Sequence, residues 1–162
     1  MDLKSALIQR LDEARHNLET VIPRVDKNKQ IYPNWTLKQM LDHIAGWDDA
    51  IVTSLRAHVD GQVPGTPADR GIDYYNEQTV ESRESLDFDR TYREFLASRR
   101  LLKQAIQEAP EEKLAMPFVV PWGPTGTISE VIEIFAGHEE EHTADILRWL
   151  ENPSQPITDS KA

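Results

Sequence analysis

Apolar residues recur every three or four positions in four long segments of the chain, which is the period of a helix with one buried face. The first segment runs from Leu3 to Val21 and ends before Pro23, and the second runs from Thr36 to Val59. The third runs from Asp89 to Glu108, and the fourth runs from Thr127 to Leu150. The pattern therefore predicts four long amphipathic helices.

The starts of the second and fourth helices carry the signature of a capping box. Thr36 is followed three positions later by Gln39, and Thr127 is followed in the same way by Glu130. In such a pair, each side chain can accept the free backbone N–H of the other residue. These pairs support the two predicted helix starts.

The connection between the second and third helices is long, from residue 60 to residue 86, and begins with several Gly and Pro residues. We expect one short helix in it, over Asp73–Arg83. The apolar, turn-rich stretch Met116–Thr125 is predicted to be an extended loop over one end of the domain, and no segment gives a clear strand pattern. These features predict an all-α four-helix bundle with a long crossover between helices two and three, rather than an up-down-up-down bundle.

The length of the chain, 162 residues, suits one domain with a core large enough to fold alone. We expect the bundle to occupy residues 1–150. Residues 151–162 are mostly polar and contain two prolines, so a flexible C-terminal tail is predicted there.

The charge of the chain narrows the classes of partner. Asp and Glu number 28 against 18 Lys and Arg, which gives a formal net charge of -10. Such a surface repels phosphate backbones and anionic lipids, so we expect no nucleic-acid partner and no membrane partner. No apolar run approaches the roughly 20 residues that a membrane span requires, and the N-terminus lacks the apolar core of a signal peptide. A cytoplasmic location is therefore predicted.

The histidines carry most of the chemical information. His138 and His142 lie one turn apart on the apolar face of the fourth helix, where an imidazole must be hydrogen-bonded or bound to a ligand. His43 lies at the edge of the apolar face of the second helix and can supply a third imidazole. The chain has no cysteine, so any metal must be held by imidazole, carboxylate or water. Three imidazoles suit Zn²⁺, Ni²⁺ or Fe²⁺, and the alternative is a structural cluster of hydrogen-bonded histidines.

The stretch GHEEEHTADIL, from Gly137 to Leu147, also satisfies the H-E-x-x-H pattern of zinc proteases. That class needs a third ligand, commonly downstream, and no histidine follows His142. Glu139, which would be the general base, is expected to rotate away from the histidine face toward the flank of the helix or the solvent. We therefore interpret the match to the protease pattern as incidental.

Several further residues are candidates for a site around the histidines. Asp42 and Asp145 are close in sequence to His43 and His142 and could orient their rings, the alternative being solvated carboxylates on the helix surface. Four aromatic residues are candidates for the wall of a substrate pocket, the alternative being ordinary packing. They are Trp47, Tyr74, Tyr75 and Trp122.

The stretches WTLKQMLDHIAGWDDA and GHEEEHTADIL resemble the DinB-like superfamily of four-helix bundles. The positions that match its pattern are Trp35, Thr36, His43, Ile44, Trp47, His138 and His142. The resemblance covers residues 1–150 and implies a divalent metal held at one end of the bundle by His43, His138 and His142, with water in the open positions.

The resemblance also implies classes of function. Members of the superfamily include metal-dependent transferases and isomerases that use low-molecular-weight thiols such as bacillithiol or mycothiol. Another branch contains self-protection proteins that inactivate DNA-damaging metabolites such as colibactin. GIDYYNEQ, from Gly71 to Gln78, is similar to the crossover of that second branch, which does not keep the histidine triad.

The function predicted from the sequence is a divalent-metal-dependent enzyme that acts on a small molecule, with a thiol-dependent transferase or a hydrolase as the named classes. Because the chain has no cysteine, any thiol must arrive as a cosubstrate. One alternative is a non-catalytic binding or self-protection protein that sequesters or inactivates a reactive small molecule, and another is a structural bundle without metal. A homodimer is compatible with such a bundle, although the sequence does not locate an interface.

Overall fold

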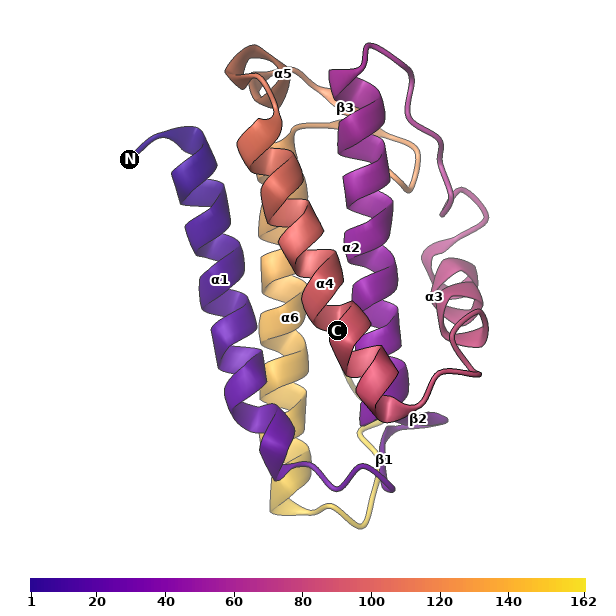
Figure 1. Cartoon of the computed structure of the whole chain (residues 1–162). Helices are drawn as coiled ribbons and strands as arrows, with labels where there is room; N and C mark the ends of the chain where they lie inside the picture. Colours follow the sequence, from indigo (N-terminus) through magenta and orange to yellow (C-terminus); the bar gives the residue numbers. More distant parts are fainter.

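Four long helices build the protein, and the computed structural model describes all 162 residues. They are α1 (Leu3–Val21), α2 (Leu37–Val59), α4 (Phe88–Glu108) and α6 (Ile128–Glu151). Helix α1 packs along α6, and α2 packs along α4. Figure 1 shows that α1 and α6 run in one direction while α2 and α4 run in the other. This arrangement is the predicted four-helix bundle with a long crossover between α2 and α4.

The helix starts are fixed by side chains that accept free backbone N–H groups. Asp2 accepts the N–H of Ser5 at the start of α1, and Asp87 accepts that of Arg90 at the start of α4, both at 2.8 Å. At the start of α6 the predicted capping box forms, since Thr127 and Glu130 accept each other's backbone N–H at 3.3 and 2.8 Å. Each cap replaces a bond that the first helical turn cannot make by itself.

The crossover contains α3 (Ile72–Glu81), as predicted, and this helix packs closely against α2. The contact passes through Gly46, where an added Cβ would lie 2.6 Å from Cγ2 of Thr79. The hydroxyl of Tyr75 donates to the carbonyl of Gly46 at 2.9 Å. A glycine at this position therefore lets the crossover helix lie directly beside the part of α2 that carries His43.

Several short elements were not predicted. They are a 3-10 turn η1 (Ile22–Arg24), helix α5 (Glu111–Ala115), and two antiparallel pairs formed by β1 (Gln30–Tyr32) with β2 (Trp35–Thr36) and by β3 (Phe118–Val119) with β4 (Thr125–Gly126). Strands of two or three residues are too short to show an alternating pattern in the sequence. The expected loop over one end of the bundle is thus largely the β3–β4 hairpin. None of the helices is long and apolar enough to cross a membrane.

Two apolar clusters form the core, and a polar layer lies between them. One cluster includes Leu11, Ile51 and Leu102, and the other includes Leu18 and Phe95. Along each long helix, the residues of the polar layer fall between members of the two clusters. They are Arg15 on α1, Asp48 on α2, Arg99 on α4 and Glu139 on α6, and all four are buried.

The segment after α6 turns and runs back along the bundle (Figure 1). The N–H of Ile157 donates to the carbonyl of Ile31 in β1 at 2.7 Å, and the side chain of Ile157 packs against the second apolar cluster. The hydroxyl of Ser160 donates to Asp145. The mobility predicted for residues 151–162 stays a prediction, and these contacts attach the segment to β1 and α6.

Candidate metal centre

Helices α2 and α6 bring His43, His138 and His142 together, and these are the three residues that the sequence predicts as ligands. The Nε2 atom of His138 lies 3.2 Å from Nε2 of His43 and 3.0 Å from Nε2 of His142. One ring nitrogen from each histidine falls within 4.8 Å of the other two. His43 and His142 are buried, whereas His138 is half-buried. Three nitrogen atoms therefore face a common point in the interior of the bundle.

A chain of hydrogen bonds fixes the orientation of the His142 ring. The hydroxyl of Tyr32 donates to Oδ2 of Asp145 at 2.8 Å, because an ionised carboxylate can only accept. The same hydroxyl oxygen lies 2.8 Å from Nδ1 of His142 and must then accept its N–H. With its proton on Nδ1, His142 presents a lone pair on Nε2 to the cluster. Asp145 thus connects to the His142 ring through Tyr32 and not directly, and its role in orienting that ring stays a prediction.

Burial keeps the three imidazoles uncharged. The pKa of His43 is lowered to about 3, mainly by desolvation and then by electrostatic repulsion from His138. Desolvation also lowers the pKa of His138 and lowers that of His142 well below its ordinary value. Neutral imidazole is the form that binds a metal ion. The donor set therefore fits a divalent ion in both its geometry and its protonation state.

His43 has an incomplete set of partners. Its Nδ1 atom is buried and forms no hydrogen bond in the structure, and its ring lies 5.0 Å from that of Trp35, centre to centre. Asn76 of α3 lies close enough to this ring to favour its protonated form, and its Oδ1 accepts the indole N–H of Trp47 at 2.7 Å. A buried polar atom without a well-formed hydrogen bond is uncommon in folded proteins and calls for an explanation such as a functional role or a bound water or ion.

Asp42 does not orient an imidazole, so this prediction is corrected. Its carboxylate accepts the hydroxyl of Thr91 and the ammonium group of Lys38, each at 2.7 Å. Asp42 is also buried, which rules out the alternative of a solvated surface carboxylate. The residue ties α2 to α4 instead of serving the histidines.

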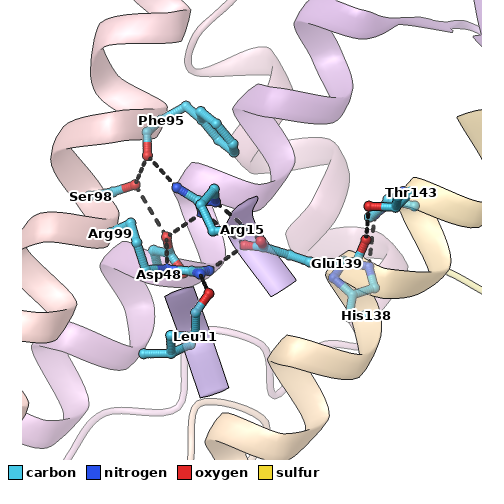
Figure 2. A network of polar contacts seen from close by, with 10 residues as sticks. Leu11, Arg15, Asp48, Phe95, Ser98, Arg99, His138, Glu139 and Thr143 are labelled. Carbon is cyan, nitrogen blue, oxygen red and sulfur yellow. Dashed lines mark hydrogen bonds and ion pairs between the residues drawn. The ribbon is translucent and has the colours of Figure 1, made fainter. Parts of the chain in front are cut away.

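Glu139 also differs from its prediction, because it points into the core and not toward the flank or the solvent. Its carboxylate accepts Nη2 of Arg15 at 2.8 Å and also pairs with Arg99 (Figure 2). Burial alone would raise the pKa of Glu139, but Arg99 and Arg15 outweigh burial and lower it. The missed signal was spacing, since Glu139 lies seven residues after Ile132 and seven before Ile146, both buried. Because two guanidinium groups engage its oxygens, Glu139 is unavailable as the base that a zinc protease requires.

Two adjoining cavities open beside the histidines, with volumes of about 470 and 370 Å³. Trp47 and Trp122, two of the predicted wall residues, line the smaller cavity. Tyr75 packs behind Trp47, with ring centres 4.5 Å apart, and lines neither cavity. Tyr74 lies against the guanidinium of Arg70 at 4.0 Å and also lines neither.

Several residues of the larger cavity wall were not predicted from the sequence. They are Tyr32, Asn34, Trp35, Asp73, Asn76, Glu77 and Ser160, together with Pro33 and Ala162. Most of them come from the β1–β2 hairpin, the crossover and the C-terminal segment, whose positions depend on contacts distant in sequence. Trp35 lies in the stretch that carries the family resemblance, and Asp73, Asn76 and Glu77 lie in the quoted segment GIDYYNEQ, but none of the four was predicted to line a cavity.

Comparison with known proteins supports the fold. The family model described as DinB superfamily matches residues 4–146. The solved structure of a sibling lethal factor precursor, DfsB, superposes with a TM-score of 0.75 at 17% identity and covers 95% of this chain and 98% of that one. The structure of a mycothiol-dependent maleylpyruvate isomerase superposes with a TM-score of 0.68 at 17% identity, covering 90% of this chain and 63% of that one. A histidine-to-alanine variant of that isomerase gives the same TM-score at 16% identity. No curated protein sequence matches the chain.

Proposed function

The chain belongs to the DinB superfamily, and on that premise we propose that it is a divalent-metal-dependent enzyme acting on a small molecule. His43, His138 and His142 hold the ion. One observation carries the proposal: three neutral imidazoles face each other through their Nε2 atoms, at 3.0 and 3.2 Å from the central ring, beside two cavities. Two nitrogens on one tetrahedral zinc ion lie about 3.3 Å apart, given zinc–nitrogen bonds of about 2.0 to 2.1 Å.

Hydrogen bonds within the cluster do not satisfy all three rings. Nε2 of His142 carries a lone pair, and a neutral His138 has one N–H at most to give. If Nε2 of His138 donates to His142, Nε2 of His43 is left without a partner. If Nε2 of His138 instead accepts an N–H from His43, the lone pairs on Nε2 of His138 and Nε2 of His142 face each other at 3.0 Å. A cation that accepts all three lone pairs removes this conflict, which favours a metal site over a self-contained structural cluster.

The chemistry of the site follows from its ligands. Zn²⁺, Ni²⁺ and Fe²⁺ all accept imidazole, and such an ion lowers the pKa of a water or thiol that it binds and polarises a carbonyl. The chain contributes no thiol of its own because it has no cysteine. One structural neighbour is a mycothiol-dependent isomerase, and we extend to this chain only the class of cosubstrate, a low-molecular-weight thiol. A thiol-dependent transferase is the reaction class that we propose.

The residues around the histidines hold and shield the site. Tyr32 and Asp145 keep the proton of His142 on Nδ1, which leaves Nε2 free to bind the ion. The ring of Trp35 lies beside that of His43 in the larger cavity, and Trp47 lines the smaller cavity with His43. We propose a small molecule as the partner of this site, and a net charge of -10 supports that choice over a nucleic acid or a membrane. A homodimer and a cytoplasmic location stay predictions.

The first experiment is elemental analysis of untagged protein, because a polyhistidine tag binds metal itself. We expect about one equivalent of Zn, Ni or Fe in the wild type and little in a His138→Ala/His142→Ala double variant that circular dichroism shows to be folded. His16→Ala is the matched control, since His16 is exposed and distant from the cluster in sequence. Wild-type protein that stays metal-free after reconstitution with each ion would refute the metal centre.

A second experiment separates an enzyme from a sequestering protein. Metal-loaded protein is incubated with a thiol and an electrophile, and product is followed over several turnovers. Turnover that is lost in His138→Ala supports the transferase. A single equivalent of ligand consumed or retained per protein, without turnover, would instead favour the non-catalytic binding or self-protection function.

A further inference from the structure

The two cavities beside the histidines have different walls. The larger one, called the polar lobe, is lined by polar side chains such as Asn34, Asp73 and Glu77. The smaller one, called the apolar lobe, is lined by the apolar residues Trp47, Ile72, Trp122, Ile134 and Phe135. His43, Asp73, Asn76 and Ala162 belong to both walls. The lobes therefore form one cleft that changes character at the histidine cluster.

Apart from the proposed metal ion, the cleft carries negative charge without any compensating cation. Neither wall contains a lysine or an arginine, whereas Asp73 lines both lobes and Glu77 lines the polar one. Neither carboxylate forms an ion pair, whereas Asp49 of the adjoining helix α2 pairs with Arg83. Such a wall attracts cations and repels anions.

The geometry of α3 directs this charge into the cleft. Asp73, Asn76 and Glu77 are spaced by three and four residues and share one face of the helix. Tyr75 and Thr79 lie on another face and attach the helix to Gly46 of α2. Asp73 and Glu77 are exposed, so this acidic face lies at the open rim of the cleft.

His43 is a second and independent sign of a ligand in the cleft. It is 3% exposed, lines both lobes, and has a buried Nδ1 atom without a hydrogen-bond partner. The charge on α3 favours a cationic ligand, and the unpartnered Nδ1 of His43 marks the junction of the two lobes as the unsatisfied part of the wall.

We propose that the cleft binds a small molecule with an apolar or aromatic part in the apolar lobe and a cationic group in the polar lobe. Its reacting atoms then lie beside His43, His138 and His142. The inference rests on the proposed metal centre and deepens it, since it names the substrate class. Anionic substrates are disfavoured, because the walls offer no Lys or Arg to pair with them.

The test compares two probes that share a phenylethyl group, carry opposite charge and coordinate metal weakly. They are phenethyltrimethylammonium and 2-phenylethanesulfonate, titrated by calorimetry into the zinc-reconstituted full-length protein. We expect the cation to bind about tenfold more tightly or better, given two carboxylates at a half-open site. In Asp73→Asn/Glu77→Gln the preference should fall toward unity. Glu111→Gln/Glu112→Gln removes the same charge at an exposed distant helix and should keep the preference.

A separate variant tests the contribution of the apolar lobe to binding. Ile72 and Ile134 are exposed, so Ile72→Ala/Ile134→Ala can be made without disturbing the core. This variant should weaken both probes by a similar factor, because it removes apolar contact and leaves the charge unchanged. A change in the charge preference alone would contradict the assignment of the apolar part to this lobe.

Sulfonate binding equal to or tighter than ammonium binding would overturn the proposal. So would a preference that persists in Asp73→Asn/Glu77→Gln, or no binding of either probe at millimolar concentration. The zinc content of each sample is measured in parallel. Stoichiometric zinc without a charge preference would refute the substrate class and leave the metal centre intact. A protein that takes up no zinc but still prefers the cation would refute the metal centre alone.

Discussion

Two buried polar clusters meet on helix α6, and adjacent residues belong to each of them. Glu139 is part of the charged layer with Arg15, Asp48 and Arg99, whereas its neighbour His138 is part of the histidine cluster. The charged layer is closed: Asp48 accepts two nitrogens of Arg99 at 3.0 and 3.1 Å and one of Arg15 at 3.2 Å (Figure 2). The histidine cluster is open, because its Nε2 atoms face each other and Nδ1 of His43 lacks a partner.

The difference between the clusters indicates that the charged layer has a structural role and the histidine cluster a functional one. The charged layer joins one residue from each long helix, and every polar side-chain atom in it has a partner, such as the carbonyl of Phe95 for Nη1 of Arg15. Such a layer sets the register of four helices between two apolar clusters. The histidine cluster lacks such a complete set of hydrogen bonds, and its unpaired nitrogens are best explained by a bound ligand.

The largest expected effect comes from opening the closed layer. Glu139→Gln leaves Arg15 and Arg99 buried with Asp48 as their only carboxylate, so we expect a loss of about 3 to 5 kcal/mol in the free energy of unfolding. Urea denaturation measures it. Glu140→Gln is the matched control, because Glu140 is exposed and pairs with Arg10, and it should cost less than about 1 kcal/mol. An equal loss of stability in the two variants would contradict the structural role of the charged layer.

The next effect is the pH dependence of metal-free protein. Folding lowers the pKa of His43 from 6.5 to about 3, so the unfolded chain binds more protons than the native one between these values. Stability should therefore fall as the pH is lowered below 6.5, with His43 contributing up to about 1.4 kcal/mol per pH unit. Urea midpoints of chelator-treated wild type and His43→Ala, measured from about pH 5 to 7, test the sign. Parallel profiles for the two proteins would contradict it.

A smaller effect should follow from breaking the support of the open cluster. Tyr32→Phe removes the hydroxyl that accepts Nδ1–H of His142, so we expect metal affinity to fall about 10- to 100-fold. Competition with a chelator of known affinity provides the measurement. Tyr92→Phe is the control, since its ring stacks on Phe95 away from the histidines. An unchanged affinity in Tyr32→Phe would show that the hydrogen bond does not position the ring.

The smallest expected effect concerns the stability of the open cluster itself. In metal-free protein, His138→Ala should change the free energy of unfolding by about 1 kcal/mol or less, because the half-buried ring contacts two histidines with which it cannot form two good hydrogen bonds at once. Urea denaturation of the two chelator-treated proteins measures the change. A loss as large as that of Glu139→Gln would mean that the histidines hold the fold together as the charged layer does.

Much of the scaffold could be predicted from the sequence because its signals are local. The bounds of the four long helices agree with the apolar period and the caps to within about two residues, the ordinary uncertainty of such assignments. The i,i+4 spacing of His138 and His142 was equally local. Tyr32 was not predicted to contact His142, since 110 positions separate the two residues and only the fold brings them together.

Glu139 shows that the residue pattern along one helix does not reveal the partners of a buried carboxylate. Its spacing relative to Ile132 and Ile146 would have indicated burial, yet a carboxylate is ordinarily expected in solvent unless a partner is known. The partners of Glu139 are Arg15 and Arg99, which lie on two other helices. Asp42 was misassigned for the same reason, since Thr91 of α4 is its partner.

The sequence by itself determined the four helices, the long crossover and a pair of histidines on one buried face, because helix period and capping act within a few residues. Only the tertiary structure decided which polar groups are paired. It joined Glu139 to two arginines, left the ring of His43 open, and turned Asp73 toward the cleft. The physical reason is that the cost of burying a polar group depends on partners supplied by other elements, and packing between helices decides where those partners lie.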